Sequence, residues 1–142
     1  MSIWKTRQLR EDKPWGGVTH HRSPFSMGAK IINLNADCRT SLKYYKNIRQ
    51  MILLYSGRVM VYAPDEKEFG DKKTDHGNYF ELAPGETLCV EAGNPYRISA
   101  LEDSVLFEVL GGPHPHSRLN EVVMLEDDYG RTPAKFTEKN DD

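Results

Sequence analysis

The chain has 142 residues, of which 38% are hydrophobic and 28% are charged, and its formal net charge is −2. This length is enough for one domain with one core. The near-neutral charge gives no electrostatic reason to expect a nucleic acid or an anionic membrane as a partner. The sequence has no apolar run of transmembrane length, no signal-peptide core at its beginning, and two cysteines without metal or disulfide spacing. We therefore expect a cytoplasmic protein.

Polar residues dominate positions 1–13, and we expect Trp4 and Leu9 to be the apolar anchors of this segment. We expect this segment to form an edge strand, or an arm that crosses to a partner subunit. Turn-forming residues follow at 14–17, and residues 27–34 predict a strand.

Two apolar runs, 51–55 and 59–62, lie on either side of Ser56-Gly57. Apolar runs that are separated by a Ser-Gly turn predict a β-hairpin. Residues 64–78 predict a charged loop. Further short strands are predicted at 79–82, 87–90, 105–110 and 122–125, where Pro-Gly and Gly-Asn-Pro turns separate apolar segments. No stretch has the amphipathic period of a convincing helix, so the sequence predicts an all-β domain.

The polar stretch that precedes the first apolar run also has a two-residue period. This period places Lys43, Tyr45 and Asn47 on one face. We interpret that face as the wall of a polar cavity, continued by an inward face at Gln50, Ile52 and Leu54. The alternative is a solvated strand.

One acidic residue, Glu108, interrupts the apolar run 105–110 and shares a face with Leu106 and Leu110. A carboxylate in such a run is rarely buried without a partner. If Glu108 points inward, Lys43 is a possible partner and the carboxylate could act as a general base. The alternative position is the solvated edge of the strand.

The spacing of these segments resembles the two halves of a cupin motif. In the first half of that motif, six residues separate a glutamate from a glycine, as they separate Gln50 from Gly57 here. In the second half, the corresponding positions are Gly85, Glu91 in the place of a proline, Gly93, and Tyr96 in the place of a histidine.

Two flanking segments narrow the resemblance. Lys13-Pro14-Trp15-Gly16 and the segment LEDDYGR at 125–131 resemble the flanks of the cupin domain of type II mannose-6-phosphate isomerases, a domain that is often fused to a GDP-mannose pyrophosphorylase. The resemblance covers about residues 11–131. It implies a single-domain cupin double-stranded β-helix, or jelly-roll barrel, at 14–131. We expect the polar residues 132–142 to be a disordered tail.

The expected metal ligands are missing from the motif. Metal-binding cupins have two histidines, a glutamate and a further histidine where this chain has Tyr45, Asn47, Gln50 and Tyr96. Transition metals prefer imidazole and carboxylate ligands, so we predict no metal and no cofactor.

Other histidines leave a non-standard metal site open. His20 and His21 are adjacent and would face opposite sides of a strand, so both cannot bind one ion. His114 and His116 lie outside the motif, in a proline-rich turn.

The first hypothesis is a metal-free cupin that binds a small polar ligand, a sugar or a sugar phosphate, in the barrel. The hydrogen bonds and aromatic surface would come from Tyr45, Asn47, Gln50 and Tyr96, while Lys43 and Arg97 at the rim would meet an anionic group. We expect a homodimer, formed through an exposed sheet or the N-terminal arm, and neither a nucleic acid nor a membrane as partner.

Three alternatives remain. One is a metal-free sugar isomerase or epimerase, in which Tyr96 or Tyr45 is the acid and Glu108 or His20 the base. Another is a metal-dependent mannose-6-phosphate isomerase, as the family resemblance implies. The third is a structural or regulatory partner of a sugar-nucleotide enzyme. Whether the chain is an enzyme stays open at this point.

Overall fold

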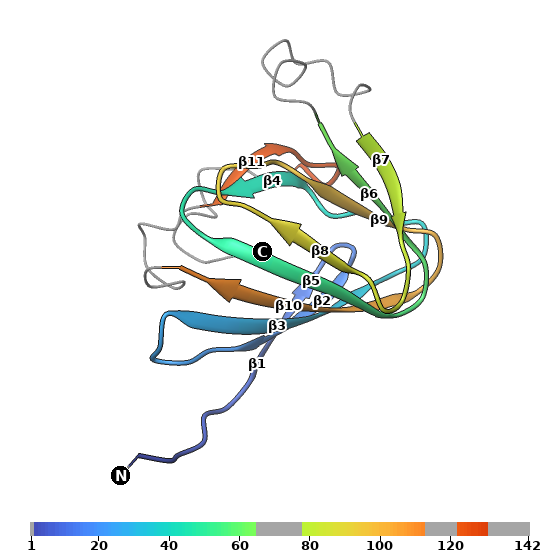
Figure 1. Ribbon diagram of the computed structural model, residues 1–142. Coiled ribbons are helices and arrows are strands. Elements are labelled where there is room, and N and C mark those ends of the chain that lie inside the picture. The colour runs from blue at the N-terminus through green and yellow to red at the C-terminus, as the bar shows by residue number, and fades with distance from the viewer. Residues whose placement is uncertain (1, 65–77, 113–121, 131–142) are drawn as a thin grey trace.

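The computed structural model describes residues 2–64, 78–112 and 122–130, which form strands and turns without a helix (Figure 1). In these ranges the strands are β1 (Leu9–Lys13), β2 (Gly16–His21), β3 (Met27–Leu34), β4 (Leu42–Tyr45), β5 (Arg49–Ser56), β6 (Val59–Ala63), β7 (Asn78–Leu82), β8 (Thr87–Val90), β9 (Arg97–Ala100), β10 (Ser104–Gly111) and β11 (Val122–Glu126). No helix of the described part could span a membrane.

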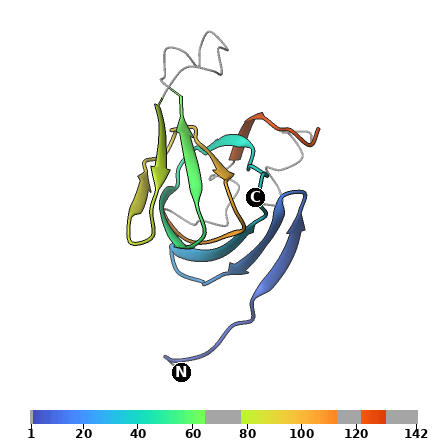
Figure 2. The same cartoon turned by 90° about the vertical axis from the view of Figure 1, so that its right-hand side faces the viewer.

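Two antiparallel layers fold over each other into a barrel (Figures 1 and 2). The first is a six-stranded sheet in the order β1-β2-β3-β10-β5-β8. The second contains β7-β6-β9 and β11-β4, and isolated bridges from Arg39 to Ser99 and from Lys43 to Tyr96 connect these two groups of strands. The predicted all-β jelly-roll barrel is confirmed.

The core follows from the alternation of residues along the central strands. On β3, β5 and β10, every second residue is buried inside the barrel. The register places Leu106 opposite both Ile32 and Leu54, and all three are almost fully buried. Because opposite residues in antiparallel strands share a face, this register produces one continuous apolar layer.

The hairpin predicted around Ser56-Gly57 is wrong. β5 pairs with β10 and β8, whereas β6 pairs with β7 and β9, so the turn connects the two sheets. A hairpin turn and a corner between sheets both place glycine between apolar strands, and the local pattern cannot distinguish them. The charged loop 65–77 lies outside the described residues, but the strands on either side of it do pair.

The N-terminal segment leaves the barrel and its apolar residues are not anchors. Trp4 and Leu9 are each 52% exposed. Trp4 packs against Phe25, with 5.9 Å between the ring centroids. β1 lies at one edge of the six-stranded sheet, beside β2.

Replacing Gly57 with alanine should destabilise the fold by about 3 kcal/mol, because two costs add at this corner. Gly57 has φ = +99°, and a Cβ atom there would collide with the Ser104 hydroxyl and the Asp103 carbonyl. Gly85→Ala is the matched control, since Gly85 has φ = +91° with open space around it, and it should cost about 1 kcal/mol. Chemical unfolding measures both, and equal losses would show that the close approach has no effect.

Candidate functional site

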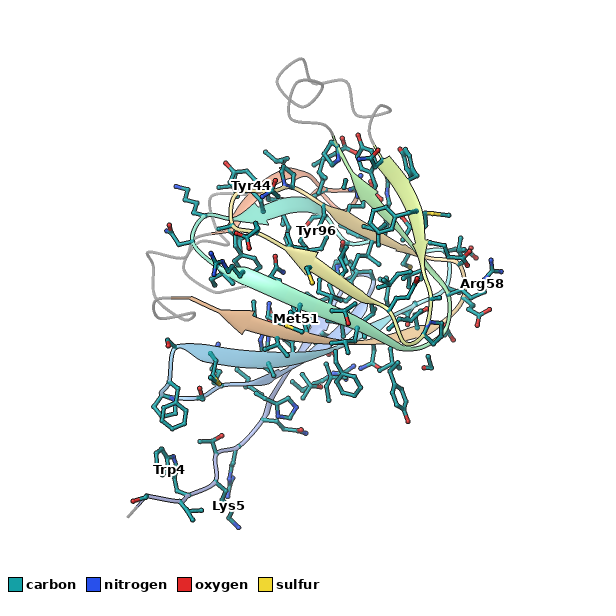
Figure 3. The ribbon with its side chains drawn as sticks, viewed as in Figure 1. Trp4, Lys5, Tyr44, Met51, Arg58 and Tyr96 are labelled. Carbon is teal, nitrogen blue, oxygen red and sulfur yellow. The ribbon has the colours of Figure 1, made fainter. Side chains whose placement is uncertain are left out.

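The inner face of the barrel carries a cluster of polar side chains from both layers, and Figure 3 shows Tyr96 between the sheets. Each member is 4% exposed or less. We define the polar cluster as Lys30, Lys43, Tyr45, Gln50, Tyr96 and Glu108. The sequence prediction that Tyr45 and Gln50 point inward agrees with this burial. Of the two positions left open for Glu108, its burial supports the inward one and excludes the solvated edge.

Gln50 is hydrogen-bonded to two members of the polar cluster at once. Its Nε2 atom donates to the Tyr96 hydroxyl at 2.6 Å and to Glu108 Oε2 at 2.9 Å. An ionised carboxylate only accepts hydrogen bonds, so the amide must turn its nitrogen toward Glu108. Tyr96 therefore accepts from Gln50 and keeps its own hydrogen for another acceptor.

The two lysines enter the cluster from different layers. Lys30 on β3 donates from Nζ to the Tyr45 hydroxyl at 2.8 Å and lies directly opposite Glu108 in the register of β3 and β10. Lys43 pairs through its backbone with Tyr96, and its Nζ atom is 5.9 Å from the centre of the Tyr96 ring. The sequence analysis named Lys43 as a possible partner of Glu108. The hydrogen bond described for Glu108 comes from Gln50.

Burial raises the pKa of Tyr96 well above its usual range, and the nearby charge of Glu108 raises it further. The hydrogen bond from Gln50 and the charge of Lys30 oppose this shift. Tyr96 therefore stays protonated at neutral pH and acts as a hydrogen-bond donor rather than as a phenolate.

Asn47 does not point inward as predicted. β4 ends at Tyr45, a bend follows, and Asn47 is exposed. Together with Arg49, Glu91 and Gly111 it lines a pocket of about 590 Å³ at the end of the barrel. The period of two fails here because it holds only while the strand continues.

The histidines face different environments. His20 is buried on β2 opposite Lys30, with Nε2 2.9 Å from Glu11 Oε1, and burial lowers its pKa. His21 is exposed, so the pair does face opposite sides. His114 and His116 lie outside the described residues, and within the described ranges no group of three His, Cys, Asp or Glu residues could hold a metal ion.

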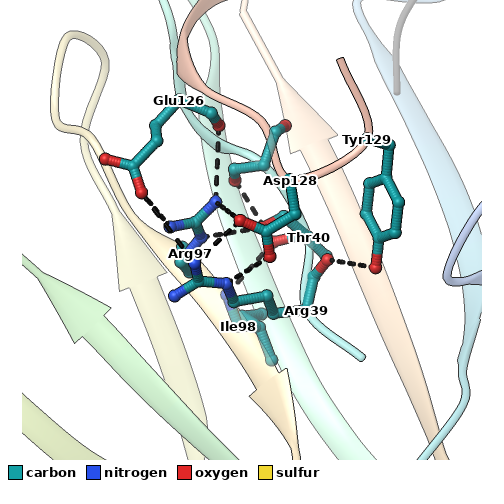
Figure 4. Close-up of polar contacts among 8 residues, drawn as sticks. Arg39, Thr40, Arg97, Ile98, Glu126, Asp128 and Tyr129 are labelled. Atoms are coloured by element: carbon teal, nitrogen blue, oxygen red, sulfur yellow. Dashed lines mark hydrogen bonds and ion pairs between the residues drawn. The ribbon is translucent and has the colours of Figure 1, made fainter. Parts of the chain in front are cut away.

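Arg97 is not at the rim, where the sequence analysis placed it. It is 3% exposed and donates to the Thr40 carbonyl at 2.9 Å and to Glu126 Oε1 at 2.8 Å (Figure 4). Arg39 donates to Asp128 beside it at 2.7 Å. We call these ion pairs the C-terminal latch, since they hold the end of β11 and the turn that follows it against the barrel.

Lys30 was missed by the sequence analysis. Its signal is a lysine on the buried face of β3, between Gly28 and Ile32, in a strand whose other inward residues are apolar or glycine. A lysine in that position is rarely buried without a partner, so the alternation alone could have indicated it.

Comparison with known proteins identifies the fold. No protein-family model and no curated protein sequence matches the chain. CapF from Staphylococcus aureus, a capsular polysaccharide assembling protein, matches with a TM-score of 0.66 and 12% identity, over 87% of this chain and 33% of CapF. KdgF from Halomonas sp. matches with a TM-score of 0.60 and 14% identity, over 74% of this chain and 86% of KdgF.

A third solved structure is procruciferin, an 11S globulin from Brassica napus, with a TM-score of 0.62 and 13% identity over 80% of this chain and 28% of procruciferin. These neighbours are cupin-fold proteins, and the chain has the cupin fold. It spans about one third of the length of CapF. The resemblance to mannose-6-phosphate isomerases stays a prediction.

Replacing Arg97 with methionine should cost about 2–3 kcal/mol of unfolding free energy, because the Thr40 carbonyl and Glu126 would lose a buried partner. Arg58→Met is the control, since Arg58 and Glu81 form an exposed ion pair and the change should stay within about 0.5 kcal/mol. Urea unfolding checks both variants. A loss at Arg97 no larger than that at Arg58 would contradict the role of the latch.

Proposed function

We propose that the chain binds a small, hydroxyl-rich anion, such as a sugar phosphate, inside the barrel and without a metal ion. The observation that carries the proposal is the polar cluster, a set of hydrogen-bonding and charged side chains that are buried inside the barrel. Burying polar groups is costly unless each is satisfied, and a binding site is the usual reason to accept that cost.

The charge of the inner face favours an anion. Lys13 is buried and lies 3.2 Å from Glu11, so these two charges compensate each other. Lys30 and Lys43 contribute two ammonium groups to the polar cluster. A phosphate or carboxylate on the ligand would accept charge-assisted hydrogen bonds from ammonium groups, and electrostatic attraction is stronger in a buried site than in water.

Two uncharged groups are suited to sugar hydroxyls. The Tyr96 hydroxyl can donate its hydrogen, as described above. Ser41 is fully buried two residues before Lys43, and its hydroxyl has no hydrogen-bond partner among the described residues. A ligand hydroxyl that both donates and accepts would satisfy such groups.

The comparisons give general support for a carbohydrate. CapF is described as assembling capsular polysaccharide. Because the identity is 12%, this likeness supports the type of ligand and no particular compound.

Mannose 6-phosphate should raise the melting temperature of the protein, whereas mannose should do so much less, because only the phosphate can accept charge-assisted hydrogen bonds from the buried lysines. Tyr96→Phe should weaken binding about tenfold by removing one hydrogen-bond donor. The control is Tyr55→Phe on the outer face, where the ring is exposed. Calorimetric titration measures the affinities.

The binding proposal would be contradicted in two ways. Equal affinity of the wild type and Tyr96→Phe would remove Tyr96 from the site. If no compound from a panel of sugar phosphates and sugar acids binds, hydroxyl-rich anions are excluded as the ligand class.

An isomerase or epimerase is the second candidate, since the Tyr96 phenol and the Glu108 carboxylate share one amide donor and therefore lie close together. The high pKa of Tyr96 weighs against it, because general acids work best with a pKa near the operating pH.

We therefore expect no exchange of carbon-bound hydrogen when the protein is incubated with mannose 6-phosphate or fructose 6-phosphate in D₂O. Proton NMR of the sugar measures the exchange. Exchange that disappears in Glu108→Gln but persists in His21→Gln would establish an isomerase or epimerase instead. His21→Gln is the control, because His21 is exposed whereas Glu108 is inside the barrel.

A further inference from the structure

The outer face of the six-stranded sheet is apolar. On β3, β5 and β10 the residues between the buried positions point away from the barrel interior. We call the following set the outer patch: Ala29, Ile31, Met51, Leu53, Tyr55, Val105, Phe107 and Val109. Four of its members are well exposed: Met51 at 48%, Tyr55 at 68%, Phe107 at 39% and Val109 at 43%.

The outer patch is contiguous. The register places Phe107 between Ile31 and Leu53, and Val109 between Ala29 and Met51. Tyr55 also contacts Phe107 edge to face, with 5.5 Å between the ring centroids. These exposures leave roughly 300–500 Å² of apolar surface, which is the size of the largest patch on a typical monomer and enough for the centre of an interface of about 800 Å² per partner.

The described ends of the sheet carry opposite charges on either side of the uncharged outer patch. Basic side chains at the end where β5 begins and β2 ends are Arg22, Lys46 and Arg49. Acidic side chains at the opposite end, around the start of β10, are Asp37, Glu102 and Asp103. Glu91 lies 3.3 Å from Arg49, and Arg58 at the acidic end is paired with Glu81.

We propose that the outer patch binds the same patch on a second copy of this chain. A two-fold axis that lies between the two sheets, parallel to them and perpendicular to their strands, would place the apolar centres against each other and the basic end of each copy beside the acidic end of the other. Two flat sheet faces stack at about 10 Å, as in a β-sandwich. The same charge pattern does not suit an anionic membrane, because the acidic end would be repelled.

The outer face of the six-stranded sheet is better suited to a dimer contact than its edge at β1. β1 has the sequence LREDK, and its Arg10 and Asp12 side chains are exposed. Charged side chains on an edge strand oppose pairing with another strand. The exposed Ile3 and Trp4 of the N-terminal arm are the competing surface.

Sedimentation equilibrium of the wild type should give a dimer at micromolar concentrations. Phe107→Lys should raise the dimer dissociation constant at least about tenfold, because it places a charge in the middle of the apolar contact. Circular dichroism should show an unchanged fold, since Phe107 points away from the barrel interior. Tyr79→Lys on β7 is the control, an exposed aromatic residue of the other layer, and should leave the dimer intact.

Three results would overturn the proposal. If the wild type stays monomeric at 100 µM, the proposed interface does not exist. Binding to phosphatidylserine vesicles in a flotation assay would then assign the outer patch to a membrane. A Phe107→Lys variant that dimerises like the wild type excludes the outer patch. Dissociation by Trp4→Lys, with no effect of Phe107→Lys, assigns the contact to the N-terminal arm.

Discussion

The two hydrogen bonds donated by the Gln50 amide are the constraint on which the barrel interior depends. They join Glu108 on the six-stranded sheet to Tyr96 in the second layer. Glu108 fixes the orientation of the amide, and the amide in turn leaves the Tyr96 hydrogen available for another acceptor. None of these polar groups would be stable alone in the core, but each satisfies a neighbour.

The C-terminal latch supports this arrangement from the other side of the backbone. Arg97 follows Tyr96 directly, and adjacent residues of an extended chain point to opposite sides. Because the Arg97 side chain is held by the Thr40 carbonyl and by Glu126, the backbone that carries the Tyr96 phenol is held as well. Glu126 at the end of β11 therefore contributes to the geometry of the interior without lying in it.

The sequence predicted the barrel fold and part of the set of inward side chains, because both depend on the alternation of residues within a strand. Gln50 was assigned correctly to the inner face for this reason, whereas Glu108 was left between the inner face and the solvated edge. Asn47 was assigned wrongly to the inner face, because β4 ends two residues earlier. Two features depend on pairing between strands that are distant in the chain: the corner at Gly57 and the position of Lys30 opposite Glu108. A local sequence pattern contains no information about such pairing.

The central claim is that hydrogen-bonding side chains occupy the place of metal ligands in this cupin fold. Elemental analysis of the protein, purified without a histidine tag, tests this claim most directly. The account predicts less than a stoichiometric amount of any transition metal. One equivalent of a metal in the wild type, lost in Gln50→Leu and retained in His21→Gln, would contradict it.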